Sequence, residues 1–301
     1  MNPQLKTPIL FIVFNRPETT AKVFETIRQA KPTRLFVAAD GSRDGRAGEK
    51  ELCATVRQIA TNVDWPCQVE TLFREKNLGC KNAVSSAITW FFNNVEQGII
   101  LEDDCLPNQS FFTFCELMLE KYRDTEKVMM VSGINRLDAN EADKDYFFSR
   151  LYSIWGWATW KRAWQKYDIE MTGWEQRRKN NELAKMFTHK RMTNVYAEIF
   201  DSVYINKVDT WDAQWAYSCL FNNGLSITPK YNLVSNIGSA GTHTHKGKNP
   251  SLFRPTRDFV CKFNDDLAIA PNNKQDWIQF KIAYPTRYLR NIAYKIYKMI
   301  K

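Results

Sequence analysis

The sequence has no run of 18 or more apolar residues, the length that a helix needs to cross a bilayer. Its seven cysteines form no C-x-x-C pair, which argues against a zinc ribbon or a dithiol redox site. The first 18 residues show no signal-peptide pattern and read as a first strand. With an odd number of cysteines, this favours reduced thiols and a cytoplasmic protein.

The 301 residues are 44% hydrophobic and 25% charged, which is typical of a globular protein. The formal net charge is +9, which favours anionic partners such as nucleotides, phosphates, nucleic acid or an acidic lipid surface. The first 150 residues contain no basic-aromatic recognition module, so we expect no nucleic-acid partner.

Short apolar runs alternate with stretches of helical periodicity through the first hundred residues. The pattern predicts βαβ units, and therefore an α/β fold with a mostly parallel sheet covered by helices on both faces. Ligands bind such sheets at the carboxyl ends of the strands. The expected strands span residues 8–15, 34–40, 68–75 and 98–104, and the expected helices span 19–30, 49–60 and 82–94.

Polar residues follow three of these expected strands. Asn15 and Arg16 follow the first and Asp40 follows the second, while the stretch GIILEDD ends in the acids of residues 102–104. Adjacent carboxylates repel one another, and a bound Mg²⁺ or Mn²⁺ turns that repulsion into attraction to a central charge. Solvated carboxylates in a turn, or acids before a helix that begins near Asn108, are the simpler alternatives.

The stretch LEDDCLPNQSFFTF resembles the metal-binding motif of GT-A-fold glycosyltransferases, and most closely that of the N-acetylglucosaminyltransferase I family and its bacterial relatives. The resemblance runs in order over much of residues 8–245. It includes the segments ILFIVFNRP, VAADGSRD, REKNLGCKNAVSSAITWFF, YSIWGWATW and WDAQW. It implies a Rossmann-like GT-A domain over residues 1–250, with a nucleotide-binding half (1–130) and an acceptor-side half (131–250). A C-terminal helical extension (251–301) would follow.

The resemblance also implies donor and metal contacts. Asp104 would touch a divalent cation, Mn²⁺ or Mg²⁺, and Glu102 and Asp103 would contact ribose, sugar or metal-bound water. Arg16 would lie near the nucleotide and Asp40 at the base, although an ordinary surface arginine and a turn acid are the simpler interpretations. The Asn-x-Gly pair Asn77 and Gly79 would also face the donor.

Asp212 in TWDAQW matches the family's catalytic base, with Asp209 as the alternative base and helix capping as the simpler role for Asp212. His243 and His245 in GTHTHKG resemble a metal-binding loop, or are two solvated histidines. One departure concerns the donor: Arg74, Glu75 and Lys76 stand where the family has a histidine before its third helix.

The function that the resemblance implies is that of an inverting, metal-dependent glycosyltransferase. Its donor would be a nucleotide-diphosphate sugar, with a UDP-sugar expected first, and its acceptor a saccharide or lipid-linked saccharide of a bacterial surface polysaccharide. A sugar nucleotidyltransferase is an alternative, although FNRPETTAK lacks the glycine-rich loop that it needs. A non-catalytic, membrane-associated carbohydrate-binding protein is another.

The last residues predict a basic amphipathic helix over 287–301. Such a helix can bind the anionic inner face of the cell membrane, or it can dock on the protein's own core. The tryptophans of YSIWGWATW are mostly expected in the core, with Trp155 and Trp157 as candidates to stack on a sugar ring.

Overall fold

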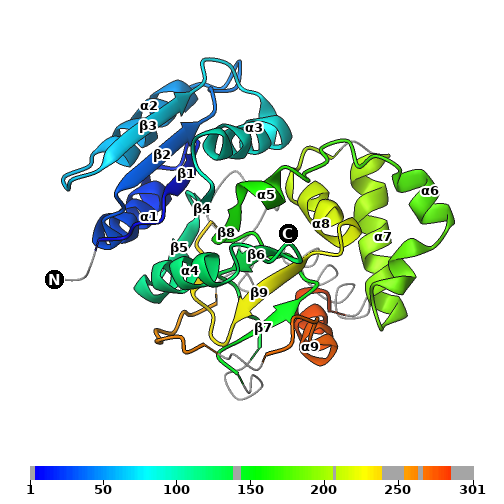
Figure 1. The fold of residues 1–301 in the computed structure, drawn as a ribbon. Coiled ribbons are helices and arrows are strands. Elements are labelled where there is room, and N and C mark those ends of the chain that lie inside the picture. Colours follow the sequence, from blue (N-terminus) through cyan, green and yellow to red (C-terminus); the bar gives the residue numbers. More distant parts are fainter. Residues whose placement is uncertain (1–3, 138–143, 206–207, 239–253, 264–266, 286–301) are drawn as a thin grey trace, which may run out of the picture.

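The computed structural model describes residues 4–137, 144–205, 208–238, 254–263 and 267–285. Its centre is an eight-stranded sheet with helices on both faces (Figure 1). The strands lie in the order β3 (Gln68–Phe73), β2 (Arg34–Ala39), β1 (Ile9–Val13), β4 (Gln97–Glu102), β8 (Trp157–Trp160), β6 (Val128–Ser132), β9 (Leu225–Pro229) and β7 (Tyr146–Ser149).

The sheet is mostly parallel, as the sequence predicts. Neighbours among β3, β2, β1 and β4 pair in parallel, and so do β6 and β9. Strand β8 is antiparallel to both β4 and β6, and β7 is antiparallel to β9, so only β8 and β7 run against the rest of this described sheet. The predicted α/β, Rossmann-like fold is therefore confirmed, and strands from both halves of the chain share one sheet.

The two faces of the sheet bury alternate residues of the same strands, because successive side chains of a strand point to opposite sides. Ile9 and Phe11 of β1 pack with one helical layer, and Leu10 packs with the other. The first layer contains α1 (Pro17–Ala30), α2 (Glu49–Thr61) and α4 (Gln109–Lys121). The second contains α3 (Gly79–Asn94), α5 (Lys161–Trp164) and α8 (Asp212–Phe221).

A separate apolar cluster lies beside the sheet, at the right of Figure 1, around the far side of α8. It is formed by α6 (Trp174–Lys179), the 3₁₀ helix η2 (Glu182–Lys185), α7 (Lys190–Tyr204) and α9 (Asn273–Ala283). α6 and η2 are separated at Asn181, whose φ of 52° lies in the left-handed region that ends helices.

The segment after residue 250 contributes α9, which docks on the sheet edge through a buried carboxylate. Asp276 accepts hydrogen bonds from the Ser149 hydroxyl and, at 2.9 Å, from the Arg150 N–H. The amphipathic helix expected over 287–301 lies outside the described residues. Within the described part of the chain, no helix combines the length and the apolar character needed to cross a membrane.

The register of the sheet brings three strand ends together. Val13 at the end of β1 pairs with Ala39 at the end of β2, and Ile12 pairs with Glu102 at the end of β4. A two-stranded sheet of β5 (Cys105–Pro107) and β10 (Val234–Asn236) continues beyond the end of β4. Side chains that follow β1, β2 and β4 therefore emerge at one edge of the sheet.

Candidate active site

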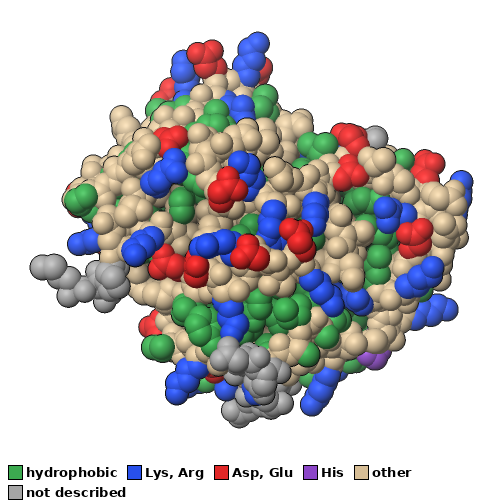
Figure 2. Space-filling model, in the orientation of Figure 1, with side chains coloured by type: hydrophobic (Ala, Val, Ile, Leu, Met, Phe, Trp, Pro, Cys, Tyr) green, Lys and Arg blue, Asp and Glu red, His purple; other side chains and the backbone are tan. Residues whose placement is uncertain are grey.

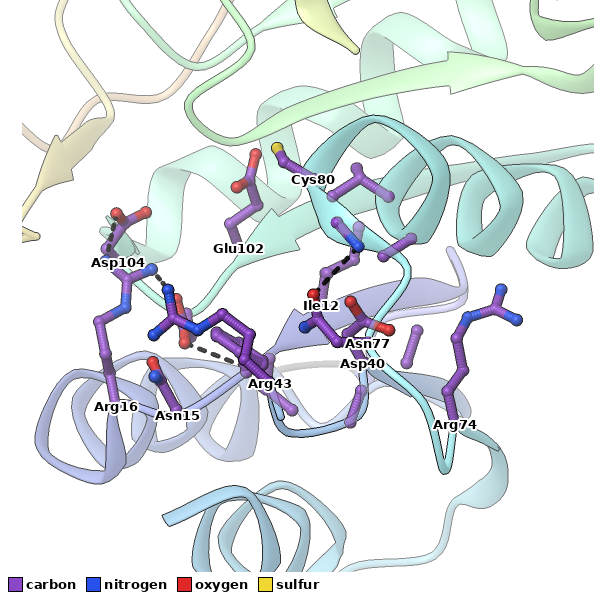
Figure 3. A pocket seen from close by; sticks show the side chains of 18 of the residues that line it. Ile12, Asn15, Arg16, Asp40, Arg43, Arg74, Asn77, Cys80, Glu102 and Asp104 are labelled. Atoms are coloured by element: carbon purple, nitrogen blue, oxygen red, sulfur yellow. Dashed lines mark hydrogen bonds and ion pairs between the residues drawn. The ribbon is translucent and has the colours of Figure 1, made fainter. Parts of the chain in front are cut away.

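A cavity of about 330 Å³ lies at this edge, between the ends of β1, β2 and β4 and the start of α3 (Figure 3). Its walls come from five separate stretches of the chain. Every donor- or metal-site residue predicted from the sequence within the described part of the chain lines it, namely Arg16, Asp40, Asn77, Gly79, Glu102, Asp103 and Asp104. Residues far apart in the sequence thus share one concave surface, which is the usual form of a ligand site.

The acids after β4 are held mainly by one arginine. Strand β4 ends at Glu102, after the buried residues Gly98 to Leu101, and the chain then turns at Asp103 and Asp104. Arg16 forms ion pairs with both aspartates, and the distance from Arg16 Nη1 to Asp104 Oδ2 is 2.9 Å. Asp103, which is 2% exposed, also accepts the Phe14 N–H at 3.3 Å. One guanidinium therefore stands against three consecutive carboxyl groups.

The crowding of these acids changes their protonation. Burial, followed by the charges of Asp104 and Asp103, raises the pKa of Glu102 to about 8. Burial raises the pKa of Asp103 to about 6, although the nearby Arg16 opposes this shift. Burial lowers the pKa of Arg16, but the charges of Asp103 and Asp104 outweigh it, so the pKa stays above its ordinary value. A second cation would relieve the remaining repulsion between the acids.

The donor set fits a hard divalent cation that is held partly by a substrate. Asp104 offers carboxylate oxygen at the cavity wall. Among the described residues, no three His, Cys, Asp or Glu side chains converge to hold a metal by themselves. Magnesium sites commonly use one or two carboxylates together with substrate phosphates and water, so the missing ligands need not come from protein. His243 and His245, the other predicted metal ligands, lie outside the described residues.

On the opposite side of the cavity, the loops after β2 and β3 fix each other. Asp40 accepts the Leu78 N–H at 3.0 Å, and Asn77 Nδ2 donates to the Gly41 carbonyl at 2.8 Å. A Cβ at Gly41 would lie 2.4 Å from the Lys76 carbonyl carbon, so the two backbones can approach this closely only with glycine there. Burial raises the pKa of Asp40. Asp40, Asn77 and Arg74 lie to the right in Figure 3, across the cavity from Arg16 and Asp104.

Two further arginines, Arg43 and Arg74, also line the cavity, although neither was predicted to be a site residue. Arg43 lies over the Phe14 ring and is paired with the buried Glu49, which also accepts Asn15 Nδ2 at 2.9 Å. Arg74 follows β3 as Arg16 follows β1, and its Nη2 donates to Ser86 at 2.7 Å. The position of Arg74 after a parallel strand is a signal that could have identified it. Three guanidinium groups on one cavity suit a multiply charged anion.

Asp212 and Asp209 are placed differently relative to this cavity. Asp209 is among the lining residues and Asp212 is not. Asp212 is the first residue of α8, and its Oδ1 accepts the Ala213 N–H at 2.9 Å and the Thr210 hydroxyl. The pKa values of Glu102 and Cys80 are raised mainly by burial and by closer carboxylates, and the charge of Asp212 makes a smaller contribution in the same direction. Asp212 thus acts electrostatically on two residues of the cavity wall.

The tryptophan cluster is largely core. Trp157 is fully buried and stacks on Trp211 with ring centroids 5.7 Å apart, so the interpretation of Trp157 as a sugar platform is wrong. Trp155 is half-buried, with the Arg136 guanidinium 5.7 Å from its ring centroid.

On the face shown in Figure 2, the described acidic and basic side chains lie next to one another and form no broad patch of a single sign. The positive net charge is therefore not gathered on this face. A nucleic-acid backbone is typically bound by a basic patch or stripe.

No family model and no curated protein sequence matches this chain. Among solved structures, it is similar to UDP-glucose pyrophosphorylase complexed with UDP-glucose, with 10% identity over 78% of this chain and 94% of that chain and a TM-score of 0.39. The apo form of UDP-glucose pyrophosphorylase is 9% identical over 77% of this chain and 93% of that chain, with a TM-score of 0.40. HddC from Yersinia pseudotuberculosis is 9% identical over 42% of this chain and 56% of that chain, with a TM-score of 0.27. Similarity this loose assigns neither a family nor a function.

Proposed function

We propose that the protein is an inverting, metal-dependent glycosyltransferase of the GT-A type, related to the N-acetylglucosaminyltransferase I family. It would move a sugar from a nucleotide-diphosphate sugar, a UDP-sugar first among them, to a saccharide acceptor. The observation that carries the proposal is the cavity at the ends of β1, β2 and β4, which is lined by the three consecutive acids 102–104 and by three arginines. Such a wall suits a diphosphate accompanied by a divalent cation.

The donor would lie across this cavity. Arg16, Arg43 and Arg74 would bind and orient its phosphate oxygens, and Asp40 with Asn77 would hold the nucleoside end. A divalent cation bound through Asp104 would neutralise charge on the leaving diphosphate. Because Arg43 is itself held by the buried Glu49, its guanidinium is positioned before the donor arrives. Such preorganisation reduces the entropy lost on binding.

Asp212 would act as the general base on the acceptor side. Inversion needs one group that takes a proton from the acceptor hydroxyl as the new glycosidic bond forms, and a well-placed base typically contributes 10²–10⁴-fold in rate. The Thr210 hydroxyl and the Ala213 N–H fix one oxygen of Asp212, and its other oxygen would take the proton. Trp155, half-buried on the same half of the chain, is the candidate aromatic platform for the acceptor sugar.

The proposed setting is bacterial surface-polysaccharide synthesis in the cytoplasm, with a saccharide or lipid-linked saccharide acceptor. The basic amphipathic pattern of residues 287–301 supports peripheral attachment to an anionic inner membrane face.

Product analysis separates this proposal from a sugar nucleotidyltransferase. The protein is incubated with Mn²⁺ and UDP-sugars, and separately with UTP and sugar 1-phosphates. A glycosyltransferase releases UDP from the first mixture and forms nothing in the second. Formation of a UDP-sugar and pyrophosphate in the second mixture would establish the nucleotidyltransferase instead. If the protein binds the donor but forms no product in either mixture, and Asp212→Asn binds the donor equally well, the protein is a non-catalytic carbohydrate-binding protein.

A further inference from the structure

Helix α3 is capped by a residue from the other half of the chain. Its N-terminal neighbour Leu78 provides no side-chain cap. Instead, Asp209 Oδ2 accepts the Cys80 N–H at 2.9 Å, and Asp209 Oδ1 accepts the Lys81 N–H at 2.8 Å. Both oxygens of one carboxylate thus satisfy the first turn of a helix that lies 129 residues earlier in the chain.

The start of α3 is shaped to receive this carboxylate. Gly79 has a φ of 76°, and a Cβ there would lie 2.8 Å from Asp209 Oδ2. Any larger residue would therefore press on the Asp209 carboxylate and would also strain the backbone. The Gly79 N–H donates to Asn77 Oδ1 at 3.2 Å, which ties this turn to the loop that contacts Asp40.

The segment that carries Asp209 also carries the proposed base. Asp209 is three residues before Asp212 and is the central residue of a tight turn, in which the Thr210 N–H donates to the Val208 carbonyl at 2.9 Å. The Thr210 hydroxyl then donates to Asp212. A short chain of contacts therefore runs from Asp40, through residues 77–81, to Asp209 and Asp212.

We infer that Asp209 is a positioning residue that sets the placement of Asp212 relative to the donor cavity, an inference that rests on the proposed function. Its two oxygens are used by α3, so its role is to hold two halves of the site together, and Asp212 remains the base. Misplacement of a catalytic group by about 1 Å can cost roughly 10²-fold in rate. The site therefore needs a contact of this kind between its donor and acceptor sides.

The test compares capping ability with basicity. Asparagine keeps one oxygen that can accept a helix N–H but cannot act as a general base, whereas alanine can do neither. Donor hydrolysis with UDP-glucose or UDP-N-acetylglucosamine and Mn²⁺ is measured in Asp209→Asn, Asp209→Ala and Asp212→Asn. We expect Asp209→Asn to stay within about fivefold of wild type. We expect Asp209→Ala to lose about 10- to 100-fold in kcat, with donor Kd and the shape of the pH–rate profile unchanged.

A matched control is Glu170→Ala, which removes the exposed Lys81–Glu170 ion pair at the same helix turn and should leave kcat unchanged. Because Asp209 is exposed, its removal leaves the core intact, and circular dichroism confirms the fold of each variant. If Asp209→Asn is as inactive as Asp209→Ala, Asp209 is a base and the inference is wrong. It is also wrong if Asp209→Ala keeps full kcat, or weakens donor binding in proportion to kcat.

Amide hydrogen exchange separates this inference from the proposed function, since it needs no activity. Asp209→Ala should speed exchange about tenfold or more at residues 80–81 and over 208–213, and Asp209→Asn, which keeps one oxygen acceptor, should restore part of the protection. If exchange changes in this way but the protein processes no sugar nucleotide, the Asp209 contact is supported and the proposed glycosyltransferase function is rejected. Unchanged exchange in Asp209→Ala would reject the positioning role whatever the activity.

Discussion

Arg16 Nη1 lies 2.9 Å from Asp104 Oδ2, which joins the residue after β1 to the last acid after β4. The same guanidinium pairs with Asp103, whose side chain is almost fully buried. Arg16 therefore supplies positive charge at the point where we propose that a cation and a diphosphate bind.

Replacing Arg16 should affect stability as well as binding. Arg16→Gln leaves the buried Asp103 carboxylate without its cationic partner, so the free energy of unfolding should fall by about 1–3 kcal/mol. Urea denaturation followed by tryptophan fluorescence measures this change. Arg28→Gln is the control, because Arg28 is on α1, the helix that begins right after Arg16, and its partners Glu25 and Asp64 are exposed. Equal losses in both variants would show that the Arg16 ion pairs are ordinary surface pairs.

Asp212→Asn tests the proposed base. The amide keeps the shape of the side chain and can still accept the Ala213 N–H, so folding and donor binding should survive. Sugar transfer, or donor hydrolysis where no acceptor is known, should fall by about 10²–10⁴-fold in kcat. Steady-state kinetics with a separate donor Kd gives both quantities. Near-normal kcat in this variant would mean that another group takes the proton.

Asp276 should make stability depend on pH. Burial raises its pKa from 3.8 to about 6, so between these values the folded protein binds more protons than the unfolded chain. Its contribution to stability is present below pH 3.8 and is lost as the pH rises through 6. The wild type should therefore lose about 2–3 kcal/mol relative to Asp276→Asn between pH 4 and 7. Denaturation series at each pH measure this, and a constant difference would contradict it.

Deleting residues 286–301 tests membrane attachment. The sequence places Leu289, Ile292 and Ile296 on one side of a helix and basic residues on the other. We expect full-length protein to sediment with anionic liposomes at low salt. The truncated protein should stay in the supernatant, with its folding midpoint and donor binding unchanged. Unfolding on truncation would instead indicate that this segment docks on the core.

The sequence was sufficient to predict the features that repeat along the chain. Strand and helix periodicity predicts the parallel strands β1 to β4, and the rule that such strands end at one edge brings Arg16, Asp40 and the acids 102–104 together. The antiparallel insertion of β8 between β4 and β6 has no local signature, because its residues Trp157 to Trp160 are buried on both faces and show no alternation.

Contacts between distant segments could not be predicted in this way. Asp209 in VDTWD reads as a local acid, and its partners at the start of α3 are set by tertiary structure alone. Arg43 in DGSRDG reads as a turn residue until Glu49 is seen to hold it at the cavity. Trp157 is a buried residue of β8, whereas Trp155 lies in the bend before β8 and packs against the other hydrophobic cluster, a difference that a cluster of tryptophans does not reveal.

The measurement that tests the central claim most directly is calorimetric binding of UDP-, GDP-, dTDP- and CMP-linked sugars, with and without Mn²⁺, to the wild type and to Asp104→Ala. We predict that one class of nucleotide sugar, UDP-sugars first among them, binds the wild type tightly only with Mn²⁺. Asp104→Ala should lose the Mn²⁺-dependent part and keep its folding midpoint. Binding that ignores Mn²⁺, or equal affinity in the folded Asp104→Ala variant, would contradict the assignment of this cavity as a metal-assisted donor site.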